Sequence, residues 1–194
     1  GELVPPELGW TGTINPAGYA NPAIWSYWYL SLSLSNVRFS YAQEAIRLEG
    51  SEKSDIISHA QIINCVRGIV MVNITSGSGV TPGSGFSLTM NNSLLASVQS
   101  ALIRNGDYDS SPGHANFNHC TVDNTQVLAN DMGNDPWLLV TFKNSVLANI
   151  NSLGNAYLWD STYNGFYSSP VFGNPAFRWS SAESPFQTSG GGAH

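Results

Sequence analysis

Charged residues are scarce in this chain of 194 residues, because Asp, Glu, Lys and Arg together make up only 10% of it. Seven residues are basic and 13 are acidic, which gives a formal net charge of −6, and the basic residues are spread thinly. A nucleic-acid-binding surface needs clustered Lys and Arg. The composition therefore excludes a nucleic-acid partner and favours a neutral or weakly charged one, such as a glycan.

Long hydrophobic runs are also lacking. The longest apolar stretch near the start, AIWSYWYL (23–30), is far shorter than the roughly 20 residues of a membrane span, so none is expected. The opening GELVPPELGW does not have the pattern of a signal peptide. Because the ending SPFQTSGGGAH (184–194) stops in a run of small residues, we expect a piece of a longer protein. Abundant Asn and Ser and scarce Lys lead us to expect a protein of bacterial type that is secreted or on the cell surface.

Helical periodicity is hard to find, and short β-rich runs are punctuated by Gly, Asn and Ser instead. Five eight-residue segments align, and their starts are separated by 28, 28, 27 and 25 residues. They are LSLSNVRF (32–39), AQIINCVR (60–67), LTMNNSLL (88–95), ANFNHCTV (115–122) and VTFKNSVL (140–147). One such unit cannot close a core alone, but stacked copies can.

The columns of this alignment indicate strands with one buried face. The first and third positions are apolar in all five copies, and the position between them is polar. The sixth position is small or modest in size. The fifth position is expected to form a ladder of stacked side chains at one turn, and it holds Asn36, Asn64, Asn92, His119 and Asn144.

The Asn-plus-small-residue motif, its apolar neighbours and the unit length resemble right-handed parallel β-helix repeat proteins, the pectate-lyase-like group. The resemblance covers about residues 30–170 and implies an all-β solenoid of about five to six coils with an asparagine ladder. The ending STYNGFYSSPVFGNPAF (161–177) is similar to the tail that follows the last coil in that group.

We expect an N-terminal cap over 1–30, the β-helix over 31–170 and a tail over 171–194 that continues in a longer protein. The fold itself hosts lyases, hydrolases, adhesins and phage spikes, so it does not decide the activity.

The stretch FNHCTVDN (117–124) combines a His, a Cys and an Asp, as a nucleophilic or metal site would. The repeat suggests an architectural role instead, with His119 replacing Asn in the ladder and Cys120 filling a small inner position. Cys65 falls in the same predicted column two coils away, about 9 to 10 Å distant, whereas a disulfide needs under about 7 Å between Cα atoms. Two free, buried thiols are therefore expected.

The inserts between repeats carry most of the acidic residues. Stacking would crowd them on one side, where they would bind Ca²⁺, supply a glycosidase acid and base, or remain solvated. Two tryptophans at insert-to-strand junctions would form a sugar platform. The candidate ligand-binding residues are Asp107, Asp109, Trp137, Trp159 and Asp160.

No catalytic residue and no resident cofactor is assigned, because the lyase and polygalacturonase motifs of the group are not found in the chain. We expect a non-catalytic extracellular module with a structural, adhesive or glycan-binding role. A polysaccharide lyase or glycoside hydrolase acting on a groove along the β-helix is the alternative. Self-association through the solenoid ends is a third hypothesis, since open strand edges pair readily.

Overall fold

The computed structural model describes residues 19–27, 30–50, 53–73, 86–106, 113–133, 138–158, 160–174 and 176–178. Within these ranges every regular element is a β-strand, which confirms the all-β expectation. Every strand pairing there is parallel. Most of the predicted N-terminal cap and C-terminal tail lies outside the described residues.

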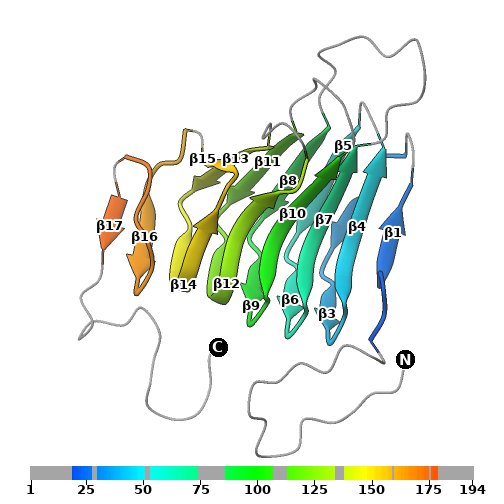
Figure 1. Cartoon of the computed structure of the whole chain (residues 1–194), viewed down its shortest axis with the longest axis horizontal. Coiled ribbons are helices and arrows are strands. Elements are labelled where there is room, and N and C mark those ends of the chain that lie inside the picture. The colour runs from blue at the N-terminus through cyan, green and yellow to red at the C-terminus, as the bar shows by residue number, and fades with distance from the viewer. Residues whose placement is uncertain are drawn as a thin grey trace, which may run out of the picture.

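The strands form two sheets (Figure 1). The large sheet has the order β1-β4-β7-β10-β12-β14-β16-β17. The short strand β9 also pairs with β12, and the short strands β6 and β3 follow β9 in that order. Its strands are β1 (Ile24–Ser26), β3 (Arg38–Ser40), β4 (Glu44–Gly50), β6 (Gln61–Ile63), β7 (Arg67–Asn73), β9 (Leu94–Ala96), β10 (Ser100–Gly106), β12 (Thr121–Asp131), β14 (Val146–Gly154), β16 (Asn164–Tyr167) and β17 (Ala176–Arg178).

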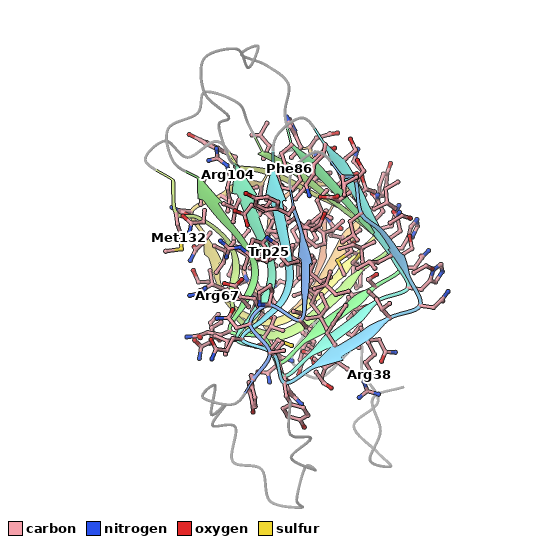
Figure 2. The ribbon with its side chains drawn as sticks, turned by 90° about the vertical axis from the view of Figure 1, so that its right-hand side faces the viewer. Trp25, Arg38, Arg67, Phe86, Arg104 and Met132 are labelled. Carbon is pink, nitrogen blue, oxygen red and sulfur yellow. The ribbon has the colours of Figure 1, made fainter. Side chains whose placement is uncertain are left out.

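The smaller sheet has six strands in the order β15-β13-β11-β8-β5-β2. They are β2 (Ser33–Ser35), β5 (Ser54–Ser58), β8 (Ser87–Asn91), β11 (Gly113–Asn118), β13 (Leu138–Lys143) and β15 (Tyr157–Leu158). The chain passes from a strand of the smaller sheet to the large sheet and then returns to pair beside its previous strand. Viewed along the stack of strands, the sheets form two walls with side chains between them (Figure 2).

Strand register corrects the predicted alignment of the second repeat. Ile57 pairs with Leu34 on one side and with Met90 on the other. The unit equivalent to 32–39 therefore begins at Asp55, five residues before the predicted start at Ala60. In addition, Val146 pairs with Gly165, so a further unit ends in β16, within the segment 161–177 that the sequence likened to a tail after the last coil.

Each unit contains two turns, five residues apart, at which a residue adopts positive φ. The first turn joins a strand of the smaller sheet to the following strand of the large sheet, with φ between 48° and 58° at Asn36, His59, Asn92, His119, Asn144 and Tyr163. The second turn follows three or four residues of strand, with φ between 47° and 59° at Tyr41, Asn64, Ser97, Asn124, Asn149 and Ser168. Asn and His are enriched in this left-handed region, which explains why the sequence repeats them.

The predicted ladder of five side chains is therefore revised. Asn64 lies at the second turn, and His59 takes its place at the first turn. His59 and the four remaining members expose their side chains, and within the described residues no side-chain hydrogen bond joins one first-turn residue to another. What the column shares is a backbone conformation. A bond between two asparagines does occur one position earlier, where Asn118 Nδ2 donates to Asn91 Oδ1 at 3.1 Å.

The core lies between the sheets and consists of inward columns that continue from unit to unit. One column contains the buried side chains of Ile57, Met90, Phe117 and Phe142, and the last two rings stack with centroids 4.7 Å apart. The residue after each first turn also faces inward. There Ser145 Oγ accepts a hydrogen bond from Cys120 N at 3.1 Å, and Asn164 Oδ1 accepts one from Ser145 N at 3.0 Å. These buried polar side chains are thus paired with backbone groups of the neighbouring unit.

Candidate functional site

An open groove of about 560 Å³ lies at the C-terminal end of the strand stack. Its residues come from the start of β14, from the first turn and start of β16, and from β17. The lining residues are Asn144, Ser145, Val146, Tyr163, Asn164, Gly165, Ala176 and Phe177.

Gly165 accounts for the shape of the groove. It pairs with Val146 on one side and with Phe177 on the other, so these three residues form one column across three strands. Its neighbour Phe166 is fully buried, and successive residues of a strand point to opposite faces, so Gly165 belongs to the outward face. Adjacent strands lie about 4.8 Å apart. Gly165 is itself buried yet lines the groove without a side chain, and we call the space beside it, between Val146 and Phe177, the slot.

Aromatic side chains flank this slot. Tyr163 is 68% exposed and Phe177 is 59% exposed, although both are large and apolar in part. Tyr163 lies at the first turn with a φ of 57°, and the strand register makes it the equivalent of Asn144, which also lines the groove. Phe177 belongs to β17, whose three residues are all exposed. The groove therefore combines exposed ring surface with hydroxyl and amide groups.

Among the described residues, none of those that line the groove is charged. The nearest charged pair in the sequence is Lys143 with Asp160, whose Nζ and Oδ2 atoms are 3.0 Å apart. Both side chains are largely exposed, so the pair is screened and neutralises itself. A neutral ligand would meet no unpaired charge on these lining residues.

The structure distributes the sequence-predicted candidates as follows. Asp107, Asp109, Trp137 and Trp159 lie outside the described residues, so their placement stays a prediction. Asp160 is described, and it pairs with Lys143 next to the groove without lining it. Sequence reasoning missed Tyr163, Gly165 and Phe177. The usable signal was the apolar position Phe166 in STYNGFYS (161–168), which corresponds to Leu147 in FKNSVLAN (142–149).

The FNHCTVDN stretch does not form a nucleophilic site. His119 is exposed, whereas Cys120 is 1% exposed and directs its thiol at the carbonyl oxygens of Asn118 and Met90, at 3.4 and 3.5 Å. Burial raises the pKa of Cys120 to about 11, and burial also raises the pKa of Cys65. Both cysteines are free and buried, as predicted. They do not share the predicted column, however, because Cys65 follows the second turn of its unit and Cys120 follows the first turn. A thiol with so high a pKa stays protonated at neutral pH and is a poor nucleophile.

A buried ion pair stabilises the N-terminal end of the stack. Lys53 Nζ lies 3.3 Å from Asp55 Oδ2, and neither side chain is exposed. Lys53 also donates to Ser26 Oγ at 2.9 Å and lies 5.3 Å from the ring centre of Phe86, while Leu32 N donates to Asp55 Oδ1 at 2.6 Å. Burial lowers the pKa of Lys53 and raises that of Asp55. These contacts are structural, because they tie β1 and β5 to the core.

A second buried pair joins β10 and β12. Arg104 Nη1 donates to both carboxylate oxygens of Asp131 at 3.1 Å. The same carboxylate accepts from Gly133 N at 3.1 Å and from Leu138 N at 2.8 Å. Asn155 then brackets the backbone of Asp131 with two further hydrogen bonds of 2.7 and 2.8 Å. Because its carboxylate is engaged in all these bonds, Asp131 serves to position backbone.

The described ranges contain neither a metal-binding group of side chains nor a membrane-spanning helix. No group of three or more His, Cys, Asp or Glu side chains that would hold a metal ion occurs among those residues. Nor do they include a helix long and apolar enough to cross a membrane.

Comparison with known proteins gives no relative for this fold or groove. No family model, no curated protein and no solved structure matches the chain. The role of the groove therefore rests on the chemistry of its own residues.

Proposed function

We propose that the chain is a right-handed parallel β-helix of five to six coils that serves as a non-catalytic, extracellular glycan-binding module. The solenoid is supported by the parallel register, in which each strand pairs with its equivalent one unit away. The recurring pair of turns in each unit supports the same interpretation. The composition, poor in charge and rich in Asn and Ser, supports a role outside the cell.

The observation that carries the binding role is the uncharged groove with its exposed rings. Aromatic side chains present a large apolar surface, and a Tyr hydroxyl adds a hydrogen-bonding tip. The apolar C–H face of a sugar ring packs on such rings, while amides and hydroxyls bond the sugar hydroxyls. Tyr163 and Phe177 supply the rings, and Asn144 supplies an exposed amide. A volume of about 560 Å³ fits a short oligosaccharide.

The lining favours binding over catalysis. Glycoside hydrolysis uses two carboxyl groups placed about 5 to 10 Å apart across the sugar. None of the described lining residues carries a carboxylate, and the buried carboxylates Asp55 and Asp131 belong to structural ion pairs. A lyase or hydrolase would need to draw its acid and base from elsewhere in the chain or in its parent protein.

A screen over immobilised neutral and acidic polysaccharides, with and without Ca²⁺, tests the proposal. We expect retention of the chain on neutral polysaccharides, independent of Ca²⁺, without release of soluble fragments. Phe177→Ala should lose at least tenfold in affinity, whereas Phe177→Tyr should keep most of it because the ring remains. Release of reducing or unsaturated ends would support the enzyme instead, and no retention by any polysaccharide would contradict the glycan-binding role.

A further inference from the structure

We infer that the outward face of the six-stranded sheet is a second binding surface, and that its ligand is a neutral, linear polysaccharide long enough to cross several strands. The inference rests on the proposed function, because it assigns the glycan class and adds a surface to the same module. It is carried by the chemistry, charge and regularity of the side chains on that face.

Two of the three outward columns on this face consist mostly of short hydroxyl and amide side chains, whereas the third contains Ser54, Ser87, His114, Leu139 and Tyr157. Side chains alternate between the two faces along each strand, so Ser33 and Ser35 of β2 point outward. Their equivalents in β5, β8, β11 and β13 point the same way, and the strand pairing aligns them in continuous columns. All of these positions are exposed or half-buried. The middle column is Ser33, Ile56, Thr89, Asn116 and Thr141, and the column beside the first turn is Ser35, Ser58, Asn91, Asn118 and Lys143.

The charge of the face selects the partner. Lys143 is the one charged residue in these two columns, and its ammonium is paired with Asp160 at 3.0 Å. The chain as a whole carries a formal charge of −6, so this neutrality is a property of the face. In these columns a uronic-acid polymer would find no unpaired cation, and a basic partner would find no carboxylate. A neutral chain of hydroxyl-bearing sugars matches the face.

Hydrogen bonds between neighbouring strands order these side chains. Ser87 Oγ donates to Ser54 Oγ at 2.8 Å, and Asn118 Nδ2 donates to Asn91 Oδ1 at 3.1 Å. Side chains fixed before binding lose little entropy when a ligand is bound, which improves affinity. Five strands carry these columns, and at about 4.8 Å spacing they present groups over about 19 Å, so the face offers repeated donors and acceptors to a repeating ligand.

The face and the groove adjoin at the first turn. Lys143 ends β13 on the face, and the next residue, Asn144, lines the groove. Tyr163 lies at the equivalent turn of the following unit and also lines the groove. One polysaccharide chain can therefore contact the groove with one segment and the face with another, which makes affinity depend on chain length.

Calorimetric titration with β-1,4-linked glucose and mannose oligomers of two, four and six units tests the inference. We expect the hexamer to bind at least tenfold more tightly than the dimer in one of the two series. The double variant Thr89→Arg, Asn116→Arg should reduce hexamer affinity to that of the dimer and leave dimer binding unchanged. Gln126→Arg adds the same kind of bulk and charge at an exposed position of β12, outside the face, and should bind as the unmodified chain does.

Each outcome of the titration decides one claim. Equal affinity for dimer and hexamer, or a hexamer affinity untouched by the double variant, overturns the extended surface while leaving the groove proposal intact. Tighter binding of a galacturonic-acid hexamer than of the neutral hexamers overturns the neutral class. Absence of binding by every oligomer overturns both proposals. If the double variant lowers the thermal unfolding midpoint, Ser54→Arg at an exposed position of the same face repeats the test.

Discussion

The two ends of the strand stack are held together by different forces. At the N-terminal end, β4 and β7 are joined by charged groups, since Glu44 contacts Arg67 at 2.7 Å and Arg47 at 3.2 Å. Glu49 accepts a hydrogen bond from the indole of Trp25 in β1. At the C-terminal end, Phe172 meets Phe142 and Phe166 edge to face, with ring centroids 5.8 and 5.1 Å apart.

This difference explains where a ligand can bind. Charges at the N-terminal end already satisfy one another, so they offer little to a partner. The C-terminal end is closed by rings within the core, and its outward surface keeps exposed rings and a slot at Gly165. Large apolar side chains are exposed at both ends, with Trp25, Tyr27 and Leu30 at the N-terminal end and Tyr163, Val171 and Phe177 at the C-terminal end. The groove described above lies at the C-terminal end, where exposed rings and an uncharged lining occur together, as expected of an interaction site.

Removing one charge from the buried pair Lys53–Asp55 should have the largest effect on stability. Asp55→Leu leaves an uncompensated buried ammonium, and we expect a loss of about 3 to 5 kcal/mol in the free energy of unfolding. The double variant Lys53→Met, Asp55→Leu should recover most of it, because a buried pair replaced by apolar side chains of similar size is often neutral. Urea denaturation measures both. A single variant as stable as the unmodified chain would contradict the structural role of the pair.

The aromatic end should respond less strongly, and without dependence on salt. Phe142→Leu keeps most of the buried apolar volume and loses the stack with Phe117 and the edge contact with Phe172. We expect a loss of about 1 kcal/mol. Repeating the urea titration at high salt should leave this loss unchanged. A loss that shrinks with salt would show that charges contribute at this end as well.

The pH dependence of stability should also separate the two ends. Because burial lowers the pKa of Lys53, the folded chain releases that proton more readily than the unfolded chain, and stability rises with pH up to the ordinary pKa of 10.5. Asp55 has a raised pKa, so its contribution falls as pH rises above its ordinary 3.8. As the pH rises toward 10.5, the unmodified chain should therefore gain stability relative to the double variant at 53 and 55. Urea titrations across this range measure the difference, and parallel curves for the two chains would contradict a lowered pKa at Lys53.

The exposed pair beside the groove should matter least. Asp160→Asn removes a screened ion pair, so we expect a change below about 1 kcal/mol in unfolding free energy, measured by urea denaturation. Because neither partner lines the groove, affinity for a neutral oligosaccharide should stay within twofold. A large loss of affinity would mean that the charge of Asp160 takes part in binding.

Much of the fold could be predicted because the inward columns and turn residues repeat in the sequence. The second unit was misaligned for a physical reason. His59 and Asn64 both adopt positive φ, and each is followed by a small buried residue, Ala60 and Cys65. Since the same pattern recurs after five residues, only the lengths of the inserts distinguish the two registers.

The groove could not be predicted from local pattern. It depends on Gly165 standing between Val146 and Phe177, and that pairing brings together strands from three successive segments. The last unit begins sooner after its predecessor than the earlier units do, so its sequence was not aligned with theirs. The alternation of apolar and polar residues in the sequence indicated the polar columns on the face of the smaller sheet. Their neutrality depends on the tertiary contact between Lys143 and Asp160, which the sequence pattern does not indicate.

The central claim is that the slot at Gly165 binds a neutral glycan. Gly165→Leu places a side chain in the slot while leaving Tyr163 and Phe177 in the sequence, so calorimetric titration of this variant with the neutral oligosaccharide that binds best tests the claim most directly. Thermal unfolding and Gln126→Leu serve as controls for folding and for added apolar surface elsewhere. Because Gly165 is buried, we expect the unfolding midpoint to fall. In a variant that is still folded at the titration temperature, we expect at least a tenfold loss of affinity. Unchanged affinity in a folded Gly165→Leu variant would contradict the claim.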